Sequence, residues 1–241
     1  MIDVVFISDL HLNPATEAIT ERFRRFIEWA LLNTKTVYIL GDLFHAWPGD
    51  DGLDEFGQHI ADQLSSLSLK GIKVYYMHGN RDFLLGKSFA KLASMTVLSD
   101  PTVITLDGKP VLLSHGDRYC TKDIGHQWLR RLTRNRLFSA FFMLIPFSFR
   151  LKIVNKLRSY SQSNRMKPKE NMDVHPESLL KDMKKHQVTL LIHGHTHKPG
   201  LTTHKISGKA FQQYVLSDWD DNPLLMCYDS SSGLHFDLMK G

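Results

Sequence analysis

The chain has 241 residues, of which 30 are Lys or Arg and 25 are Asp or Glu, and its pI is near 9.1. With 42% hydrophobic and 23% charged residues it has an ordinary globular composition, which excludes a disordered, collagen-like or coiled-coil chain. Two cysteines cannot build a disulfide framework, so we expect a reducing compartment. No apolar run approaches the roughly 20 residues of a membrane-spanning helix, and the opening MIDVVFISDL lacks the basic region of a signal peptide.

Five short aliphatic runs are predicted strands, and each is followed at once by polar residues. The runs cover residues 4–7, 37–40, 74–77, 111–113 and 190–192. Runs of this length that stop at Gly, Asp or Asn are typical of buried strands.

Helical periodicity lies between the early strands. Apolar residues recur every three or four positions over residues 19–31, and further helices are predicted over residues 54–69 and from Pro176 to about residue 186. Alternating strands and helices predict an α/β fold with parallel strands at its start. The last third is richer in strands (103–106, 111–113, 215–216 and 224–228), which predicts a second, mixed sheet.

Nearly all the chemically active side chains follow the predicted strands, where parallel sheets form their binding sites. They are Asp9, His11, Asp42, Asn80, His115, His195 and His197. Seven nitrogen and oxygen donors without a thiolate suit Mn²⁺, Fe²⁺, Zn²⁺ or Co²⁺ rather than a structural zinc. They are too many for one tetrahedral ion, so we expect two ions that share a carboxylate, an arrangement that cleaves phosphate esters. Taken singly, each has a plainer interpretation as a turn residue or a surface histidine.

This ordered set resembles the calcineurin-like metallophosphoesterases. The resemblance implies a four-layered α/β/β/α sandwich with a helical insertion. It also implies a ligand set for each of two ions, with Asp42 bridging them: Asp9, His11, Asp42 and His197 for one, and Asp42, Asn80, His115 and His195 for the other. Asn80 and His115 are also expected to be catalytic.

Arg81 departs from the broad family pattern, because many members carry histidine at that position. Arginine cannot act as a general acid, but it can hold phosphate oxygens and stabilise developing charge. We therefore expect Arg81 to be catalytic and the leaving group to need little protonation, as phosphate does when a diphosphate is split.

Longer stretches, within residues 38–51, 78–86, 114–117 and 191–197, resemble the UDP-2,3-diacylglucosamine pyrophosphatases. That family hydrolyses UDP-2,3-diacylglucosamine at the α-phosphorus, giving UMP and 2,3-diacylglucosamine 1-phosphate (lipid X) in lipid A synthesis. The resemblance implies two Mn²⁺ ions, a lipid-linked nucleotide-sugar substrate and a peripheral position on the cytoplasmic face of the bacterial inner membrane. No protein partner is predicted.

A basic and apolar segment interrupts the chain between the fourth and fifth strands. Residues 118–169 hold 13 Lys or Arg and one acid, a net +12, whereas the other 189 residues hold 17 bases and 24 acids, a net −7. Within it, residues 137–147 are mostly apolar, too few to cross a bilayer. They are interpreted as an interfacial segment or acyl-chain lining, or alternatively as the core of a small helical hairpin. We expect one domain over 1–241, with this insertion at about 124–170.

Alignment with the family places eight residues on substrate-contacting positions: Asn80, Arg81, Asp123, Arg158, Ser161, Asn164, Lys167 and His195. Ser163 is a rival of Ser161. We expect Arg130, Arg134 and Lys152 on a solvated helix face, and Trp47 either packs or stacks on substrate.

Other functions stay open on the sequence alone. One is a metallophosphoesterase for a soluble phosphodiester or a phosphoprotein, and another is a catalytically inactive, membrane-associated binding module. We expect no nucleic-acid partner, because the aromatic residues of the basic segment form one apolar block rather than alternating with the basic residues.

Overall fold

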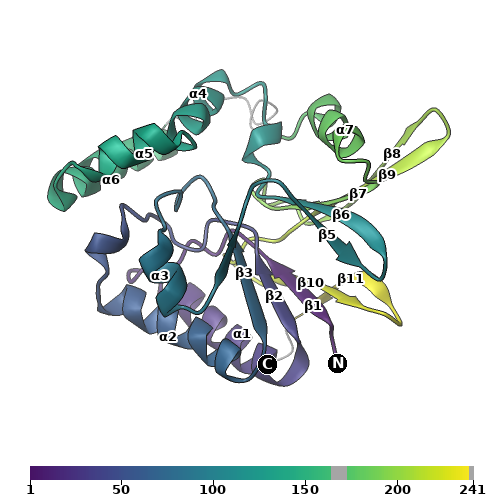
Figure 1. The fold of residues 1–241 in the computed structure, drawn as a ribbon, viewed down its shortest axis with the longest axis horizontal. Coiled ribbons are helices and arrows are strands. Elements are labelled where there is room, and N and C mark those ends of the chain that lie inside the picture. Colours follow the sequence, from purple (N-terminus) through teal and green to yellow (C-terminus); the bar gives the residue numbers. More distant parts are fainter. Residues whose placement is uncertain (164–172, 239–241) are drawn as a thin grey trace.

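Two β-sheets pack face to face between layers of helices, which confirms the predicted four-layered sandwich (Figure 1). The structure is a computed structural model, and it describes residues 1–163 and 173–238. Asn164 and Lys167 lie outside the described residues, as do the side chains of Ser161 and Ser163.

The first sheet has the strand order β11-β10-β1-β2-β3-β4. Its strands are β1 (Val4–Ile7), β2 (Thr36–Ile39), β3 (Lys73–Met77), β4 (Thr96–Leu98), β10 (Leu224–Asp229) and β11 (Gly233–Leu238). Strands β1 to β4 are parallel, as predicted, and β10 is antiparallel to β1. The prediction that residues 224–228 belong to the second sheet is wrong, because β10 lies in the first. Alternate residues of β10 face different cores, Leu225 towards the helices and Met226 towards the other sheet, which a central strand of this sheet requires.

The second sheet is mixed, as predicted, with the order β5-β6-β7-β9-β8. Its strands are β5 (Thr102–Leu106), β6 (Lys109–Ser114), β7 (Leu190–His193), β8 (Gly200–Ile206) and β9 (Lys209–Val215). Strands β6, β7 and β9 run parallel, and antiparallel β5 and β8 form the two edges. The carboxyl ends of β6 and β7 therefore present His115 and His195 at one edge of this sheet.

Three apolar layers hold the sandwich together. Helices α1 (Glu17–Asn33), α2 (Glu55–Leu69) and α3 (Lys87–Leu92) cover the first sheet, and α7 (Pro176–Lys185) covers the second. Phe23, Phe26 and Ala30 of α1 are buried at the three- and four-residue spacing that predicted this helix. Two short 3-10 turns, η1 (Asp50–Gly52) and η2 (Asp117–Tyr119), follow β2 and β6.

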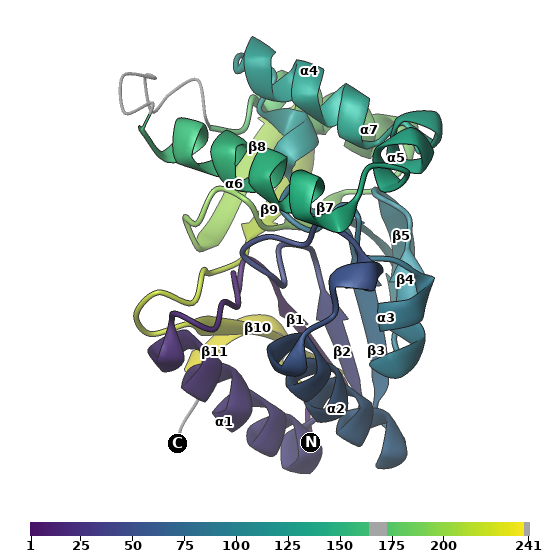
Figure 2. The same ribbon diagram turned by 90° about the vertical axis from the view of Figure 1, so that its left-hand side faces the viewer.

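Three helices, α4 (Ile124–Thr133), α5 (Arg136–Met143) and α6 (Phe147–Ser163), form the described part of the insertion (Figures 1 and 2). Phe142 and Val154 pack on Leu84 of the body, so part of the apolar run is core. The Arg150 guanidinium is buried, donates to the Pro48 carbonyl and pairs with Asp51. The α5–α6 pair is therefore fastened to the loop after β2.

Helix α4 is fastened to the body by two arginines. Arg130 Nε lies 3.1 Å from Asp117 Oδ1, and its Nη2 lies 3.2 Å from Asp100 Oδ2. Arg134 Nη2 donates to the carbonyl oxygens of His78 (2.9 Å) and Gly79 (3.2 Å). The prediction that these two arginines lie on a solvated helix face is therefore wrong. The fully buried Asp117 carboxylate requires a cation beside it, and the arginines supply that charge. Lys152 is exposed, as expected.

We predict that Arg130→Ala lowers the free energy of unfolding by about 3–5 kcal/mol, because it leaves the buried Asp117 carboxylate poorly compensated. Arg131→Ala is the matched control, since Arg131 is the next residue of the same helix and is exposed over the Trp128 ring. Urea denaturation measures both variants. Equal stability of the two variants would contradict a structural role for the Arg130–Asp117 pair.

Candidate metal centre

The loops that follow β1, β2, β3, β6 and β7 meet at one edge of the two sheets, and they bring all seven candidate ligands together. His11 Nε2 lies 3.2 Å from Asp42 Oδ2, and His197 Nε2 lies 3.4 Å from Asp9 Oδ1. His115 Nε2 lies 3.0 Å from Asn80 Oδ1, and the rings of His115 and His195 are 5.1 Å apart. Residues separated by up to 188 positions in the sequence thus share one small site.

Left-handed backbone marks this site. Five of the seven candidates have positive φ: Asp9 (55°), His11 (54°), Asp42 (54°), His195 (72°) and His197 (54°). Such a conformation costs a non-glycine residue about 1–3 kcal/mol and persists only where the surroundings enforce it. Five of the seven residues that the sequence singled out thus have strained backbone, which supports a functional role for them.

The Asp9 carboxylate is buried and fixed on one side only. Its Oδ2 accepts hydrogen bonds from the Ser8 hydroxyl (2.6 Å) and the His195 N–H (2.7 Å). Oδ1 is buried, and among the described residues it accepts no hydrogen bond that meets standard geometry. Burial opposes ionisation, yet His197 and His115 hold the pKa of Asp9 below its usual range. An ionised oxygen left open in this way is suited to a cation.

Asp42 is the second buried carboxylate of the centre. Its Oδ1 accepts from the Arg81 N–H (2.9 Å), while Oδ2 lies 3.2 Å from His11 Nε2 and 3.3 Å from Arg81 Nε. Burial disfavours its charge, but His115 and His11 hold the pKa of Asp42 well below the usual range. Two ionised carboxylates therefore lie side by side in the protein interior.

The histidines complete the donor set with fixed orientations. His115 Nδ1 lies 2.8 Å from the Leu40 carbonyl and must carry the proton there, which turns Nε2 towards Asn80 and the centre. Burial, followed by the charge of His115, lowers the pKa of His195 to about 3, so the His195 ring is neutral. His197 Nδ1 lies 3.1 Å from Asp218; burial opposes protonation, but Asp218 and Asp9 raise the pKa of His197 to about 10.

Among the described residues, two groups of side chains could hold a metal ion, and each places its ligand atoms within 4.8 Å of one another. One is Asp9, His11 and His197, and the other is Asp9, Asp42 and His115. The first contains three of the four residues expected from the family for one ion and lacks Asp42. The second adds Asp9 beside Asp42 and His115, and Asn80 lies next to it. Imidazole, carboxylate and amide donors fit divalent transition metals.

Asp82 is a positioning residue that the sequence did not single out. Its fully buried carboxylate accepts from the N–H groups of Asp42 (3.3 Å), Leu43 (2.7 Å) and Gly79 (2.8 Å), so it ties the loop after β2 to the loop after β3. A Cβ on Gly79 would lie 2.0 Å from Asp42 Oδ1, so only glycine permits this approach. The sequence signal that could have identified Asp82 is its position: it is an acidic residue directly after Asn80 and Arg81.

The proposed substrate residues differ in how they are placed. Arg81 is held against Asp42, and Arg158 of α6 is close enough for its charge to interact with that of Arg81. Burial, then Arg81, lowers the pKa of Arg158 to about 10, and its Nε has no hydrogen-bond partner among the described residues. Asp123 caps α4 by accepting from the His126 N–H (3.0 Å), and the His126 ring stacks on His195. Helix α6 and the first turn of α4 thus both approach the centre.

Trp47 packs in the core and does not offer a free ring face. It is buried against Phe44 and Phe89, and its Nε1 donates to Asp50 Oδ1 (2.9 Å). This settles the alternative that the sequence left open in favour of packing.

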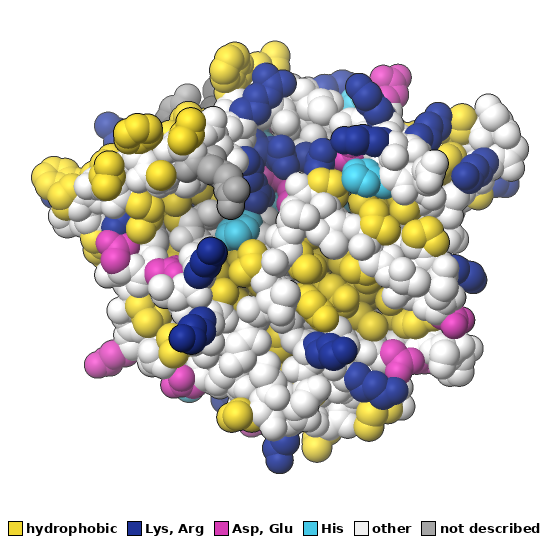
Figure 3. All heavy atoms as spheres, in the orientation of Figure 1, with side chains coloured by type: hydrophobic (Ala, Val, Ile, Leu, Met, Phe, Trp, Pro, Cys, Tyr) yellow, Lys and Arg dark blue, Asp and Glu magenta, His cyan; other side chains and the backbone are white. Residues whose placement is uncertain are grey.

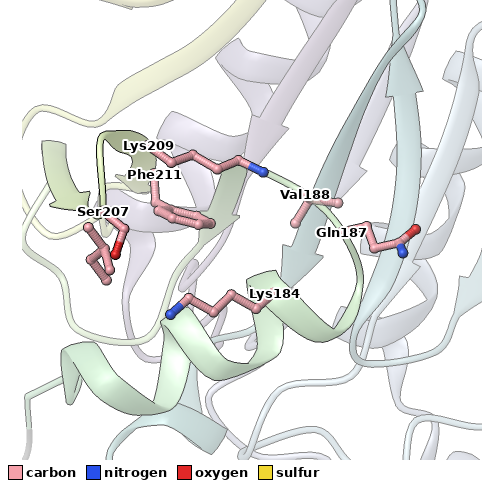
Figure 4. A pocket seen from close by; sticks show the side chains of 7 residues that line it. Lys184, Gln187, Val188, Ser207, Lys209 and Phe211 are labelled. Atoms are coloured by element: carbon pink, nitrogen blue, oxygen red, sulfur yellow. The ribbon is translucent and has the colours of Figure 1, made fainter.

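Two surface cavities lie elsewhere. One of about 360 Å³ lies between α7 and the β8–β9 hairpin, lined by residues that include Lys184, Lys209 and Phe211 (Figure 4). The other, of about 390 Å³, lies near the amino end of β3 and is lined by residues that include Ser68, Lys73 and Thr96. Neither contains a candidate ligand, so the centre is a convergence of loops rather than one of these cavities.

The chain is similar to known proteins over most of its length. The sequence profile of the calcineurin-like phosphoesterases matches residues 2–199. A UDP-2,3-diacylglucosamine hydrolase of Pseudomonas putida is 44% identical over 90% of this chain and 91% of its own, and one of Pseudomonas aeruginosa is 45% identical over 91% and 92%. A solved archaeal phosphodiesterase aligns with 98% of each chain at 12% identity and a TM-score of 0.49. On the strength of the profile match and the two Pseudomonas relatives, this chain belongs to the calcineurin-like phosphoesterase family.

Proposed function

We propose that the chain is a metal-dependent hydrolase that cleaves UDP-2,3-diacylglucosamine at the α-phosphorus, releasing UMP and 2,3-diacylglucosamine 1-phosphate for lipid A synthesis. The convergence of seven oxygen and nitrogen donors, two of which are buried, ionised carboxylates, carries this proposal. The Pseudomonas relatives that are named as hydrolases of this compound support the choice of substrate.

Two divalent ions, Mn²⁺ in the simplest case, fit the donor set. Asp9, His11, Asp42 and His197 would hold one ion, and Asp42, Asn80, His115 and His195 the other. Such ions supply Lewis-acid stabilisation of charge on phosphoryl oxygens and make water a stronger nucleophile at neutral pH. Binding of the two ions would neutralise the buried negative charge of Asp9 and Asp42.

Arg81 and Arg158 would receive the diphosphate. Arg81 uses its Nε and backbone N–H on Asp42, and one terminal nitrogen lies 3.2 Å from His45 Nδ1, which leaves its remaining outer N–H groups for phosphate oxygens. The buried Nε of Arg158 has no hydrogen-bond partner among the described residues, and a phosphate oxygen would supply an acceptor. The departing sugar phosphate is already a stable anion, so arginine suffices where a proton donor would otherwise be needed.

Substrate contacts by Asn80, Asp123 and His195 are part of the same proposal. It also includes Ser161, Asn164 and Lys167, which cannot be placed from the described structure.

We predict that the purified protein with Mn²⁺ releases UMP from UDP-2,3-diacylglucosamine, and that Asp42→Ala or His115→Ala lowers kcat by about 10²–10³-fold or more. Nucleotide product analysis by chromatography measures the reaction. His59→Ala, at an exposed histidine of α2, is the control and should keep full activity. Activity that survives Asp42→Ala would refute the ligand assignment, and faster turnover of bis-p-nitrophenyl phosphate would favour a soluble phosphodiester.

We predict that the metal-stripped protein takes up two Mn²⁺ ions per chain and becomes more stable when it does. At 100 times the dissociation constant, binding at one site adds about 2.7 kcal/mol to the free energy of unfolding. Calorimetric titration and thermal denaturation measure stoichiometry and stability. Fewer than one bound ion per chain would instead favour a binding module without catalysis.

The insertion has the surface of a membrane-associating element. Within the described residues, no helix combines the length and apolar composition needed to cross a bilayer. Large apolar side chains are nonetheless exposed between residues 124 and 149: Ile124, Trp128, Leu137, Phe141, Leu144 and Phe149. Hydrophobic side chains gather over α4–α6 at the upper left of Figure 3. Exposed Arg131 and Lys152 lie over the rings of Trp128 and Phe149. We propose that this face rests on the cytoplasmic surface of the inner membrane, where it would receive the acyl chains.

We predict that the triple change Arg131→Glu, Lys152→Glu and Lys156→Glu weakens binding to vesicles with anionic lipid by at least about tenfold, since each basic residue near such a surface contributes about 1 kcal/mol. The control reverses the same charge far from the insertion, through Lys70→Glu, Lys73→Glu and Lys109→Glu, all exposed. Vesicle co-sedimentation measures both. Equal partitioning of the two variants would contradict a membrane-facing insertion.

A further inference from the structure

One histidine near the centre has no role in the proposed metal set. His45 lies in the loop after β2, three residues beyond Asp42, and its Nδ1 is 3.2 Å from a terminal nitrogen of Arg81. The two metal-binding groups of the described residues do not include His45. Its neighbour is the arginine that would bind the phosphoryl group.

The chemistry of this contact fixes the state of the imidazole. A guanidinium group can only donate hydrogen bonds, so His45 Nδ1 must accept, and the ring must be neutral with its proton on Nε2. The surroundings favour that state, because burial and the charges of Arg158 and Arg81 lower the pKa of His45 to about 4. At neutral pH the ring is therefore a ready acceptor.

The imidazole is held by a rigid loop. The His45 N–H donates to the Leu12 carbonyl (3.0 Å), and the Trp47 N–H donates to the Arg81 carbonyl (3.2 Å). Trp47 is buried between Phe44 and Phe89, which anchors the loop in the core. The backbone of Arg81 and the ring that meets its side chain thus belong to one hydrogen-bonded unit.

We propose that His45 is a positioning residue that orients the Arg81 guanidinium for the transferred phosphoryl group. Asp42 engages Arg81 at the backbone N–H and at Nε, and this leaves rotation of the planar group to be fixed at its outer end. The neutral His45 ring fixes it there and adds no charge that would compete with the phosphate. The inference rests on the proposed function, and it assigns His45 no contact with substrate.

The test is a double-mutant cycle between His45 and Arg81 in the metal-loaded enzyme. His45→Leu removes the acceptor, whereas His45→Asn offers a side-chain oxygen near the position of Nδ1. We expect His45→Leu to lower kcat about 10–100-fold, because a misplacement of about 1 Å can cost that much, with KM changed less than about twofold. His45→Asn should recover most of the loss. In an Arg81→Ala background neither change should lower kcat further.

Each failure has its own meaning. If Arg81→Ala leaves kcat intact, the role of Arg81 in the proposed function is wrong, whatever His45 does. If Arg81→Ala is damaging but His45→Leu costs the same factor in both backgrounds, His45 acts independently and the inference is overturned. Equal loss in His45→Leu and His45→Asn also overturns it. Metal content and thermal stability are measured for every variant, so that lost metal is not mistaken for lost orientation.

A second measurement needs no change at His45. Histidine ¹⁵N NMR of the protein loaded with diamagnetic Zn²⁺ should show a His45 ring protonated on Nε2 alone, with an Nδ1 resonance that shifts in Arg81→Ala. A proton on Nδ1, or an Nδ1 resonance unaffected by Arg81→Ala, would overturn the inference.

Discussion

Two ionised carboxylates buried side by side, Asp9 and Asp42, impose the constraint on which the rest of the structure depends. Each has an exposed fraction of only 1%, so water cannot screen their charges from one another. The protein gives them N–H donors, imidazoles and one guanidinium, yet Asp9 Oδ1 accepts no hydrogen bond of standard geometry from the described residues. A bound cation would compensate the negative charge of the two carboxylates. The surrounding histidines lie where they could serve as its further ligands.

Holding these groups in place requires strained backbone, and the body of the sandwich stabilises it. Five candidate ligands have left-handed φ at the ends of strands. Hydrogen-bonded neighbours on both sides of β1 and β2, three apolar layers and the buried Asp82 carboxylate secure the loops that carry them. Rigid strands thus carry short strained loops, which suits a site that must hold several donors at metal-binding distances.

The basic residues of the insertion fall into two groups, one that forms contacts within the protein and one that is exposed. Arg130, Arg134 and Arg150 point inwards and fasten α4–α6 to the loops beside the centre. Arg131 and Lys152 point outwards beside exposed aromatic rings. The net charge of this segment therefore overstates what is available to an anionic surface, because part of it compensates Asp117, Asp100 and Asp51 within the protein.

The sequence by itself determined the strands β1, β2, β3, β6 and β7, the helices α1, α2 and α7, and the polar residues at the strand ends, because periodicity and stop signals are local properties of the chain. The resemblance to the phosphoesterases added the layering and the pairing of ligands with ions. The pairing of the arginines, the place of β10 in the first sheet and the Asp82 contacts that tie two loops of the centre together appear only in the tertiary structure. These features depend on contacts such as Arg134 with Gly79 and Arg150 with Pro48, 55 and 102 positions apart, which no local pattern encodes.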